Sequence, residues 1–366
     1  MIEDVAAAFE QKNYKKAAQL LKPLLKQFPD DPWVRLYWAM LNETNGKPDV
    51  AETLYRTLLR DVRNPKVALQ ARQGLLRLEV AERETRQQAI ARAEEMAEHS
   101  GNSGSGFLVL EPIHGEARKT AAQSLARIMK LDPYTAQLQL PSRGWRLYRT
   151  GTIGELQVYG EELRKSGIPA FWVALSQIRK IRMFRVQYIQ TISPQPMVVC
   201  QNESGHLGTL TFDWSDVSQQ VRALLPIFED VVDLDARNKL TRKEKTQDYA
   251  QVCDLHLPQR HCILRICDRS YQFQHGIQFN AQQNGKTGGS QSTLRLRWNS
   301  LLRVLDQNLN DVPTATSFTS FAETALDHLD LVETFETHID LFRKSSTNWD
   351  PAFQIYSGLV FLYPTH

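Results

Sequence analysis

The sequence predicts a multidomain protein of mixed composition: helical hairpins at the N-terminus, then a small α/β domain, then an α+β domain with an antiparallel sheet and a long closing helix. Three observations indicate this order. Apolar residues recur at helical spacing up to residue 98, a Gly/Ser segment interrupts the chain, and strand and helix patterns alternate after it. We therefore expect helical repeats in 1–98, a linker in 99–106, an α/β domain in 107–190 and an α+β domain in 191–366.

The composition is that of a folded chain with balanced charge. Its 366 residues are 42% hydrophobic and 9% aromatic, which is enough for several cores. A net charge of +3 provides no overall attraction to nucleic acid or to an anionic membrane. The four cysteines form no C-x-x-C motif, so we expect reduced thiols in a cytoplasmic protein. We expect no secretory signal and no transmembrane segment, because no run of 18 apolar residues occurs.

The helical region repeats with a period of 34 residues. Ala17 and Ala51 stand 34 apart, where two helices cross too closely for larger side chains. Apolar stripes follow both alanines, and Pro29 and Pro65 end the two units. A third, less regular pair of helices is expected within 67–78 and 89–96.

This pattern resembles the tetratricopeptide repeat (TPR) over roughly the first 98 residues. It departs from the family at Lys12, where a turn glycine is expected, and at Pro48, where an aromatic residue is expected. The resemblance implies stacked hairpins with a concave groove that binds a protein segment. The alternative is an array that packs only on its own chain. On the binding interpretation, the predicted contact residues are Tyr14, Lys15, Trp38 and Asn42.

The segment after the linker alternates between strand and helix patterns. Strands are expected at 107–113, 145–148, 168–173 and 183–189, with helices at 117–128, from Asp132 and from Thr152. Thr152-x-x-Glu155 is a capping box that opens the last of these helices. This order, with the run from Thr152 to Ala170, resembles the fold shared by the ribosomal stalk C-terminal domain and the ClpS-type protease adaptor. The resemblance implies a fold and a tendency to bind protein, and it assigns no site residue.

The C-terminal part predicts an antiparallel sheet followed by helices. Strands are expected at 197–202, 209–214, 252–257, 261–268 and 271–279, and a strand at Thr293–Arg297 runs into a helix. We also expect a helix at 217–228, an exposed connector at 240–251 and a flexible loop at 282–292. A closing amphipathic helix of about 26 residues is predicted from Ser317 to Phe342, followed by an apolar tail.

Charge is unevenly distributed in this part. Residues 257–303 contain seven Arg or Lys and one acid, whereas 304–342 contain eight acids and no Arg or Lys. The two regions either neutralise each other or leave a basic sheet face for an acidic partner. In the second case the contact residues are Arg265, Arg295 and Arg297, of which the last two share a strand face.

The sequence shows no recognised motif for catalysis or cofactor binding. The sequence lacks the phosphate-binding, dinucleotide-binding, hydrolase and zinc-protease motifs. Cys253, His256, His261, Cys262 and Cys267 lie close in sequence, but strand alternation turns Cys262 away from His261 and Cys267. We therefore expect no metal, no cofactor and no enzymatic activity.

Together these patterns predict a non-enzymatic adaptor or scaffold that binds protein. The segments LHLPQR, RWNSLL and LFRKSSTNWDPAF resemble TPR-bearing proteins of unassigned role found in cyanobacteria. That resemblance implies assembly or regulation of a larger complex, such as a photosynthetic one. The alternative is a nucleic-acid-binding regulator that uses a basic face of Arg179, Arg182, Arg295 and Arg297. The identity of the partner and the oligomeric state are left open.

Overall fold

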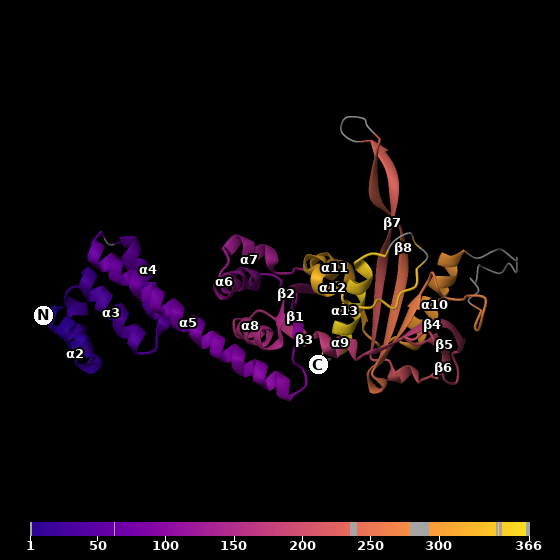
Figure 1. The fold of residues 1–366 in the computed structure, drawn as a ribbon, viewed down its shortest axis with the longest axis horizontal. Coiled ribbons are helices and arrows are strands. Elements are labelled where there is room, and N and C mark those ends of the chain that lie inside the picture. Colours follow the sequence, from indigo (N-terminus) through magenta and orange to yellow (C-terminus); the bar gives the residue numbers. More distant parts are fainter. Residues whose placement is uncertain are drawn as a thin grey trace. The chain divides into compact units, whose positions relative to one another are not determined.

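The structure is a computed structural model, and it describes residues 2–61, 63–234, 240–278, 293–341, 343 and 346–363. The chain forms two compact units, Met1–Arg92 and Ala93–His366. The described part of the first is helical, and the second combines two sheets with helices (Figure 1). Within the described ranges, no helix combines the length and apolar character needed to cross a bilayer.

The first unit consists of two helical hairpins and the start of a fifth helix. The helices are α1 (Ile2–Glu10), α2 (Tyr14–Gln27), α3 (Pro32–Thr44), α4 (Pro48–Asp61) and α5 (Pro65–His99). Ala17 and Ala51 are fully buried, as the repeat predicts. Lys12 has a φ of 54°, so it adopts the left-handed conformation that a turn glycine would take at this position.

The third helical pair is a single helix, which corrects the prediction of two. Helix α5 continues for 35 residues. Residues 79–88 contain neither glycine nor proline, and the ion pairs Arg83–Glu79 and Arg86–Glu82 support the helix at i, i+4 spacing. The unit boundary at Arg92 therefore lies inside a helix, and the predicted linker at 99–106 already includes the first strand residues.

A three-stranded antiparallel sheet begins the second unit, in the order β2-β1-β3. Its strands are β1 (Ser105–Leu110), β2 (Arg146–Thr152) and β3 (Ala170–Ala174). Helices α6 (Ala117–Met129), α7 (Pro133–Gln139) and α8 (Ile153–Lys165) connect them, in the predicted sequence of elements. Asp132 caps α7 and Thr152 caps α8, as expected. Leu108 and Leu110 pack under α6 and α8 on one face of this sheet.

A seven-stranded mixed sheet follows, in the order β10-β7-β8-β9-β4-β5-β6. Its strands are β4 (Arg182–Thr191), β5 (Met197–Gln201), β6 (Leu207–Thr211), β7 (Gln219–Leu234), β8 (Leu240–Leu257), β9 (Cys262–Cys267) and β10 (Thr314–Ala315). Two pairings are parallel, β4 with β9 and β10 with β7. The predicted domain boundary at residue 190 falls inside β4, so the strand expected at 183–189 belongs to this larger sheet.

The predicted helix at 217–228 and the connector at 240–251 are both wrong, because these segments pair as the hairpin of β7 and β8. The apolar residues of β7 fit both the spacing of a helix and the two-residue alternation of a strand. Burial of Val221, Ala223 and Leu225 shows that the strand alternation holds. Pro226 lies beyond the two residues of β7 that pair with β10, where a strand tolerates a missing N–H. The far ends of β7 and β8 pair as a two-stranded ribbon that extends from the sheet (Figure 1).

Three further predictions in this part require correction. The strand expected at Thr293–Arg297 is the start of α10 (Leu294–Asn308), capped by Thr293. Residues 271–278 form turns instead of a strand. The closing helix is broken into α11 (Phe318–Ala325), a 3₁₀ turn and α12 (Leu329–Val332), although Phe335 still packs in the core. The loop expected at 282–292 lies outside the described residues, as does Phe342.

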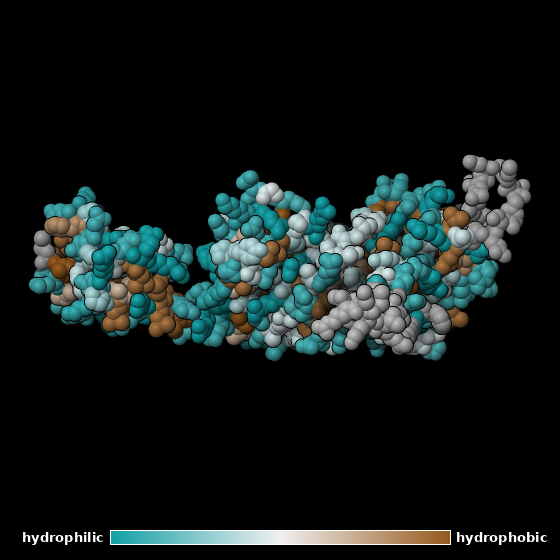
Figure 2. Space-filling model, turned by 90° about the horizontal axis from the view of Figure 1, so that it is seen from above, coloured by the Kyte–Doolittle hydropathy of each residue, from teal (hydrophilic) through white to brown (hydrophobic). Residues whose placement is uncertain are grey.

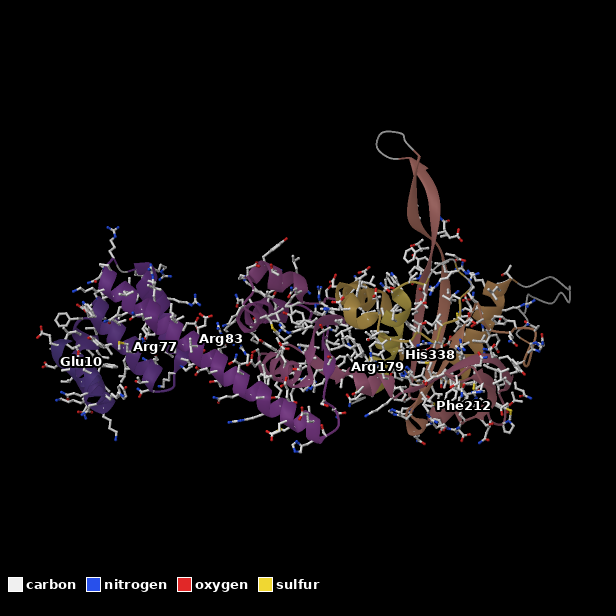
Figure 3. All side chains as sticks on the ribbon, viewed as in Figure 1. Glu10, Arg77, Arg83, Arg179, Phe212 and His338 are labelled. Atoms are coloured by element: carbon white, nitrogen blue, oxygen red, sulfur yellow. The ribbon has the colours of Figure 1, made fainter. Side chains whose placement is uncertain are left out.

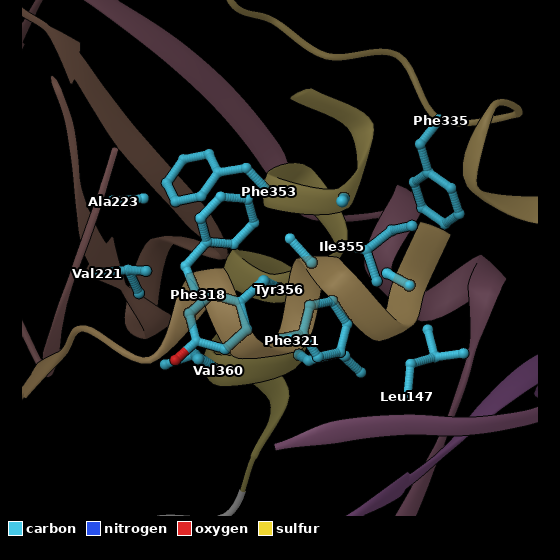
Figure 4. Close-up of a cluster of buried hydrophobic side chains, with 14 of the residues drawn as sticks. Leu147, Val221, Ala223, Phe318, Phe321, Phe335, Phe353, Ile355, Tyr356 and Val360 are labelled. Atoms are coloured by element: carbon cyan, nitrogen blue, oxygen red, sulfur yellow. The ribbon is translucent and has the colours of Figure 1, made fainter. Parts of the chain in front are cut away.

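Helix α13 (Trp349–Leu362) joins the two sheets through one core. Residues 350–360 are all buried, so the apolar tail is an interior helix. Phe353 and Tyr356 contact Phe318 and Phe321 of α11 (Figure 4). The same cluster contains Phe107 from the smaller sheet and Val221 from the larger one. The regions 107–190 and 191–366 therefore share a core and are not separate domains.

Candidate protein-interaction surface

An aromatic row lies on the two hairpins of the first unit. Its members are Tyr14, Phe9, Tyr37 and Trp33, and we call this set the aromatic row. Successive ring centroids are 5.9, 5.3 and 6.3 Å apart. Tyr14 is 36% exposed and the other three are half-buried. Rings held in this way present apolar contact area at low entropic cost, as protein-binding surfaces require.

Local structure fixes each member of the row. The left-handed turn at Lys12 leads into Asn13, whose Oδ1 accepts a hydrogen bond from Lys16 N at 3.1 Å and so starts α2 at Tyr14. Asp31 Oδ1 accepts from Trp33 N at 2.8 Å and starts α3. Trp33 and Tyr37 are then four residues apart on one helical face.

Charged side chains lie beside the aromatic row. Burial raises the pKa of Tyr37, and the nearby carboxylate of Glu10 raises it further, so the phenol stays protonated. Glu10 is exposed at the end of α1 (Figure 3). Lys15 follows Tyr14 in sequence and is also exposed. The surface is therefore apolar in its middle, with one acidic and one basic side chain close to it.

The four predicted contact residues of this unit have different surroundings. Tyr14 belongs to the row, and Lys15 is exposed beside it. Trp38 is 36% exposed but is not a member of the row. Asn42 is buried at 5% exposure, and its Nδ2 donates to the carbonyl of Trp38 at 2.8 Å. Asn42 therefore stabilises α3 and offers no surface to a partner.

Phe9, Trp33 and Tyr37 were not among the contact residues predicted from the sequence. Trp33 and Tyr37 have a usable signal, since two aromatic residues four apart on a helix share a face. Phe9 lacks one, because its contact with Tyr14 depends on the turn between α1 and α2.

A polar cluster holds the hairpins to α5. Tyr55 Oη donates to Glu43 Oε2 at 2.6 Å, and Arg77 donates Nε and Nη2 to the two oxygens of Glu43 at 2.8 and 2.9 Å. Arg77 lies on α5 (Figure 3). Burial raises the pKa of Tyr55 well above its usual value, and the hydrogen bond to Glu43 adds to this effect. The cluster joins α3, α4 and α5 into one support for the row.

The predicted basic sheet face does not form. Arg265 is buried and pairs with Asp254. Arg295 is exposed and Arg297 half-buried, and both lie on α10, where residues two apart do not share a face. Arg179 donates to Thr334, and Arg182 donates to the carbonyl of Arg260. Of the four residues invoked for nucleic acid, Arg179 and Arg182 are thus engaged in internal hydrogen bonds, and Arg295 and Arg297 lie on a helix instead of a shared strand face.

The interior of the second unit contains a polar network with the residue types of a hydrolase. Ser357 Oγ donates to Asp254 Oδ2 at 2.6 Å, and His256 Nε2 lies 3.0 Å from Ser357 Oγ. The serine stands between the other two, whereas nucleophile activation needs the histidine in the middle. All three side chains are fully buried. The network therefore holds α13 on β8 and has no access for a substrate.

Metal chemistry has no support in the described part of the chain. No group of three His, Cys, Asp or Glu side chains there could hold a metal ion. The four cysteines are buried and free. Cys262 packs with Leu264 and Ile266 in one core, as the strand alternation predicts.

Comparison with known proteins connects the first unit to a repeat family. The tetratricopeptide repeat model matches residues 8–72, from the end of α1 to the first turns of α5. No curated protein and no solved structure matches the chain. Tetratricopeptide repeats in general mediate protein–protein interaction, and proteins of the family are typically non-enzymatic.

Proposed function

We propose that the chain is a non-enzymatic adaptor or scaffold whose N-terminal hairpins dock a partner protein on the aromatic row. The observation that supports this proposal is the row itself: four rings in succession, half-exposed, on the segment that matches the repeat family. A partner segment with an apolar anchor residue fits such a surface, because aromatic side chains dominate the energy of protein interfaces.

A narrower proposal concerns the setting. The four buried free thiols suit a reducing compartment such as the cytoplasm. The resemblance of three short segments to TPR-bearing proteins of cyanobacteria supports a role in assembling or regulating a larger complex, such as a photosynthetic one. The ClpS or stalk type of fold stays a prediction for the three-stranded sheet and its helices.

The test is quantitative co-purification of the tagged full chain from its own host, with nuclease present. We would compare the wild type with a Tyr14→Ala, Trp33→Ala double variant, and with Tyr134→Ala as a control on an exposed ring in the second unit. We expect one stoichiometric partner with the wild type and the control, and loss of that partner with the double variant. Undiminished recovery with a folded double variant would contradict the proposal.

A further inference from the structure

Helix α5 has apolar residues on two opposite sides. Val67, Ala71 and Gly74 are buried against α3 and α4. Leu69, Leu76 and Val80 lie on the other side, and they are 57%, 62% and 43% exposed. Their spacing of seven and four residues aligns them along the helix. We call these three residues the outer stripe. Figure 2 shows hydrophobic residues at the surface of the helical unit.

Repeat architecture explains why an apolar stripe here is unusual. In a stack of hairpins each inner helix is covered on both sides, and the terminal helix carries a polar outer face. In this chain α5 continues as one long helix where the third hairpin would turn back, so its own chain supplies no covering helix within the first unit's described residues. The outer stripe is therefore the site where one more antiparallel helix would pack.

The charges beside the stripe indicate which helix fits. From Pro65 to Leu78 the helix carries three basic residues and no acid, whereas Glu79, Glu82 and Glu84 follow directly. Helical spacing puts Arg72 and Glu79 on one side of the stripe, and Lys66 and Glu84 on the other. All four are exposed. An antiparallel helix that also has a basic first half and an acidic second half would place an opposite charge beside each of these four residues.

A second copy of α5 meets this requirement. In a two-fold antiparallel pair, the same flank of both helices comes together. Arg72 then lies beside the second copy's Glu79, and Lys66 beside its Glu84. Both pairings place the two-fold axis next to Leu76, so the two Leu76 side chains pack on each other. In this pair, the aliphatic part of Arg72 covers Val80 of the other copy, and the aliphatic part of Arg83 covers Leu69 of the other copy.

We propose that the outer stripe is a self-association surface, on which α5 pairs antiparallel with α5 of a second copy of this chain. The surface uses a different helix face from the aromatic row, and self-association does not depend on that row. Arg83, which projects from α5 near the stripe (Figure 3), forms an ion pair with Glu79 at 3.5 Å within one copy. That pair is exposed, so its exchange for a pairing between copies costs little.

Sedimentation velocity of the full chain over a concentration series tests the proposal. We expect a dimer for the wild type and for the control Leu207→Asp, which alters an equally exposed leucine on β6. Leu76→Asp should raise the dissociation constant by about tenfold or more, because it places two carboxylates at the axis. A wild type that stays monomeric at about 100 μM, or a dimer unaffected by Leu76→Asp, would overturn the proposal.

Exchanging the charges of Arg72 and Glu79 tests whether the partner is a second α5 and whether the two helices run antiparallel. Arg72→Glu and Glu79→Arg should each weaken the dimer, and the double variant should restore it, since each flank regains an opposite charge. Failure of the double variant to restore a dimer, with both single variants folded by circular dichroism, would exclude this pairing. An α5 that binds a foreign helix would show no dimer in purified protein at all.

Cysteine cross-linking measures the register. Paired helices lie about 8–10 Å apart, so Leu76→Cys places two thiols within disulfide reach at the axis. Leu69→Cys is the matched control: it stands seven residues away, and its two copies would be roughly 20 Å apart in an antiparallel pair. We expect an oxidised dimer for Leu76→Cys alone. A stronger cross-link for Leu69→Cys would contradict the antiparallel register.

Discussion

Asp254 and Arg265 stand opposite each other on β8 and β9 and form a bidentate ion pair inside the second unit. Arg265 Nε lies 2.9 Å from Asp254 Oδ1, and Nη2 lies 2.7 Å from Oδ2. The remaining donor Nη1 of Arg265 reaches Gln354 Oε1 of α13 at 2.8 Å, and the guanidinium lies over the Phe353 ring. An ion pair between neighbouring strands thus fixes the position of the helix that joins both sheets.

Loss of this pair should destabilise the second unit strongly. Arg265→Met leaves the Asp254 carboxylate buried without its counter-ion, which costs about 3–5 kcal/mol of unfolding free energy. Breaking the exposed pair of Arg56 and Glu52 by Arg56→Met should cost less than about 1 kcal/mol. Urea unfolding followed by tryptophan fluorescence would compare the two. Equal losses would show that the buried pair has no special role.

The stability of the second unit should fall with acid because of His256. Burial lowers the pKa of His256 to about 4, and this outweighs the opposite effect of Asp254. The unfolded chain binds this proton near pH 6.5, whereas the folded chain resists it until about pH 4. Stability is therefore complete above pH 6.5 and decreases as the pH falls toward 4, by up to about 3 kcal/mol.

His256→Gln should make the stability of the second unit less dependent on pH between 6.5 and 4, with unfolding free energies measured in urea at each pH. Gln retains a donor for Ser357 Oγ but cannot be protonated in this range. His206→Gln, which makes the same replacement at an exposed position outside the Ser357 network, provides the control. An identical pH profile for wild type and His256→Gln would show that His256 is not the group responsible.

The native thiols should react slowly. Burial raises the pKa of Cys200 and Cys267 to about 11 and that of Cys253 to about 12. Because the thiolate is the reactive form, titration with a thiol reagent at pH 8 should detect almost no cysteine in the folded chain and all four after denaturation. Fast reaction of one or more native thiols would show that this part of the core opens readily.

The sequence predicted local features better than strand partners. The repeat alanines, the caps at Asp132 and Thr152 and the element order from β1 to β3 depend on neighbouring residues, and the structure confirms them. The β7–β8 hairpin was missed, because the first half of β8 is polar in sequence and shows no strand pattern, and its strand structure depends on pairing with β7.

The candidate site shows the same difference between features set by local sequence and features set by tertiary packing. Tyr14 was predicted from its place in the repeat, and it belongs to the aromatic row. Asn42 was predicted as a groove residue of the repeat and Arg265 as part of a basic sheet face, yet both are buried with hydrogen-bond partners. A single sequence does not show whether a polar side chain has an internal partner, because that partner depends on tertiary packing.

Gly74 allows Tyr55 to pack against α5, which leads to a last prediction. A Cβ atom built on Gly74 would lie 2.4 Å from Tyr55 Cζ, and Tyr55 is fully buried with its hydroxyl bonded to Glu43. The ring cannot move without breaking that hydrogen bond. Gly74→Ala should therefore destabilise the helical unit by about 1–3 kcal/mol, although alanine is the better helix former.

Thermal unfolding by circular dichroism would measure the loss. Gln73→Ala, at the exposed neighbouring position, should be neutral or slightly stabilising and serves as the control. Tyr55→Leu should be destabilising by itself, but it removes the ring that meets the new Cβ atom. Adding Gly74→Ala to Tyr55→Leu should then cost less than adding it to the wild type. An equal cost in both backgrounds would mean that the contact between Gly74 and Tyr55 does not limit the packing of α5.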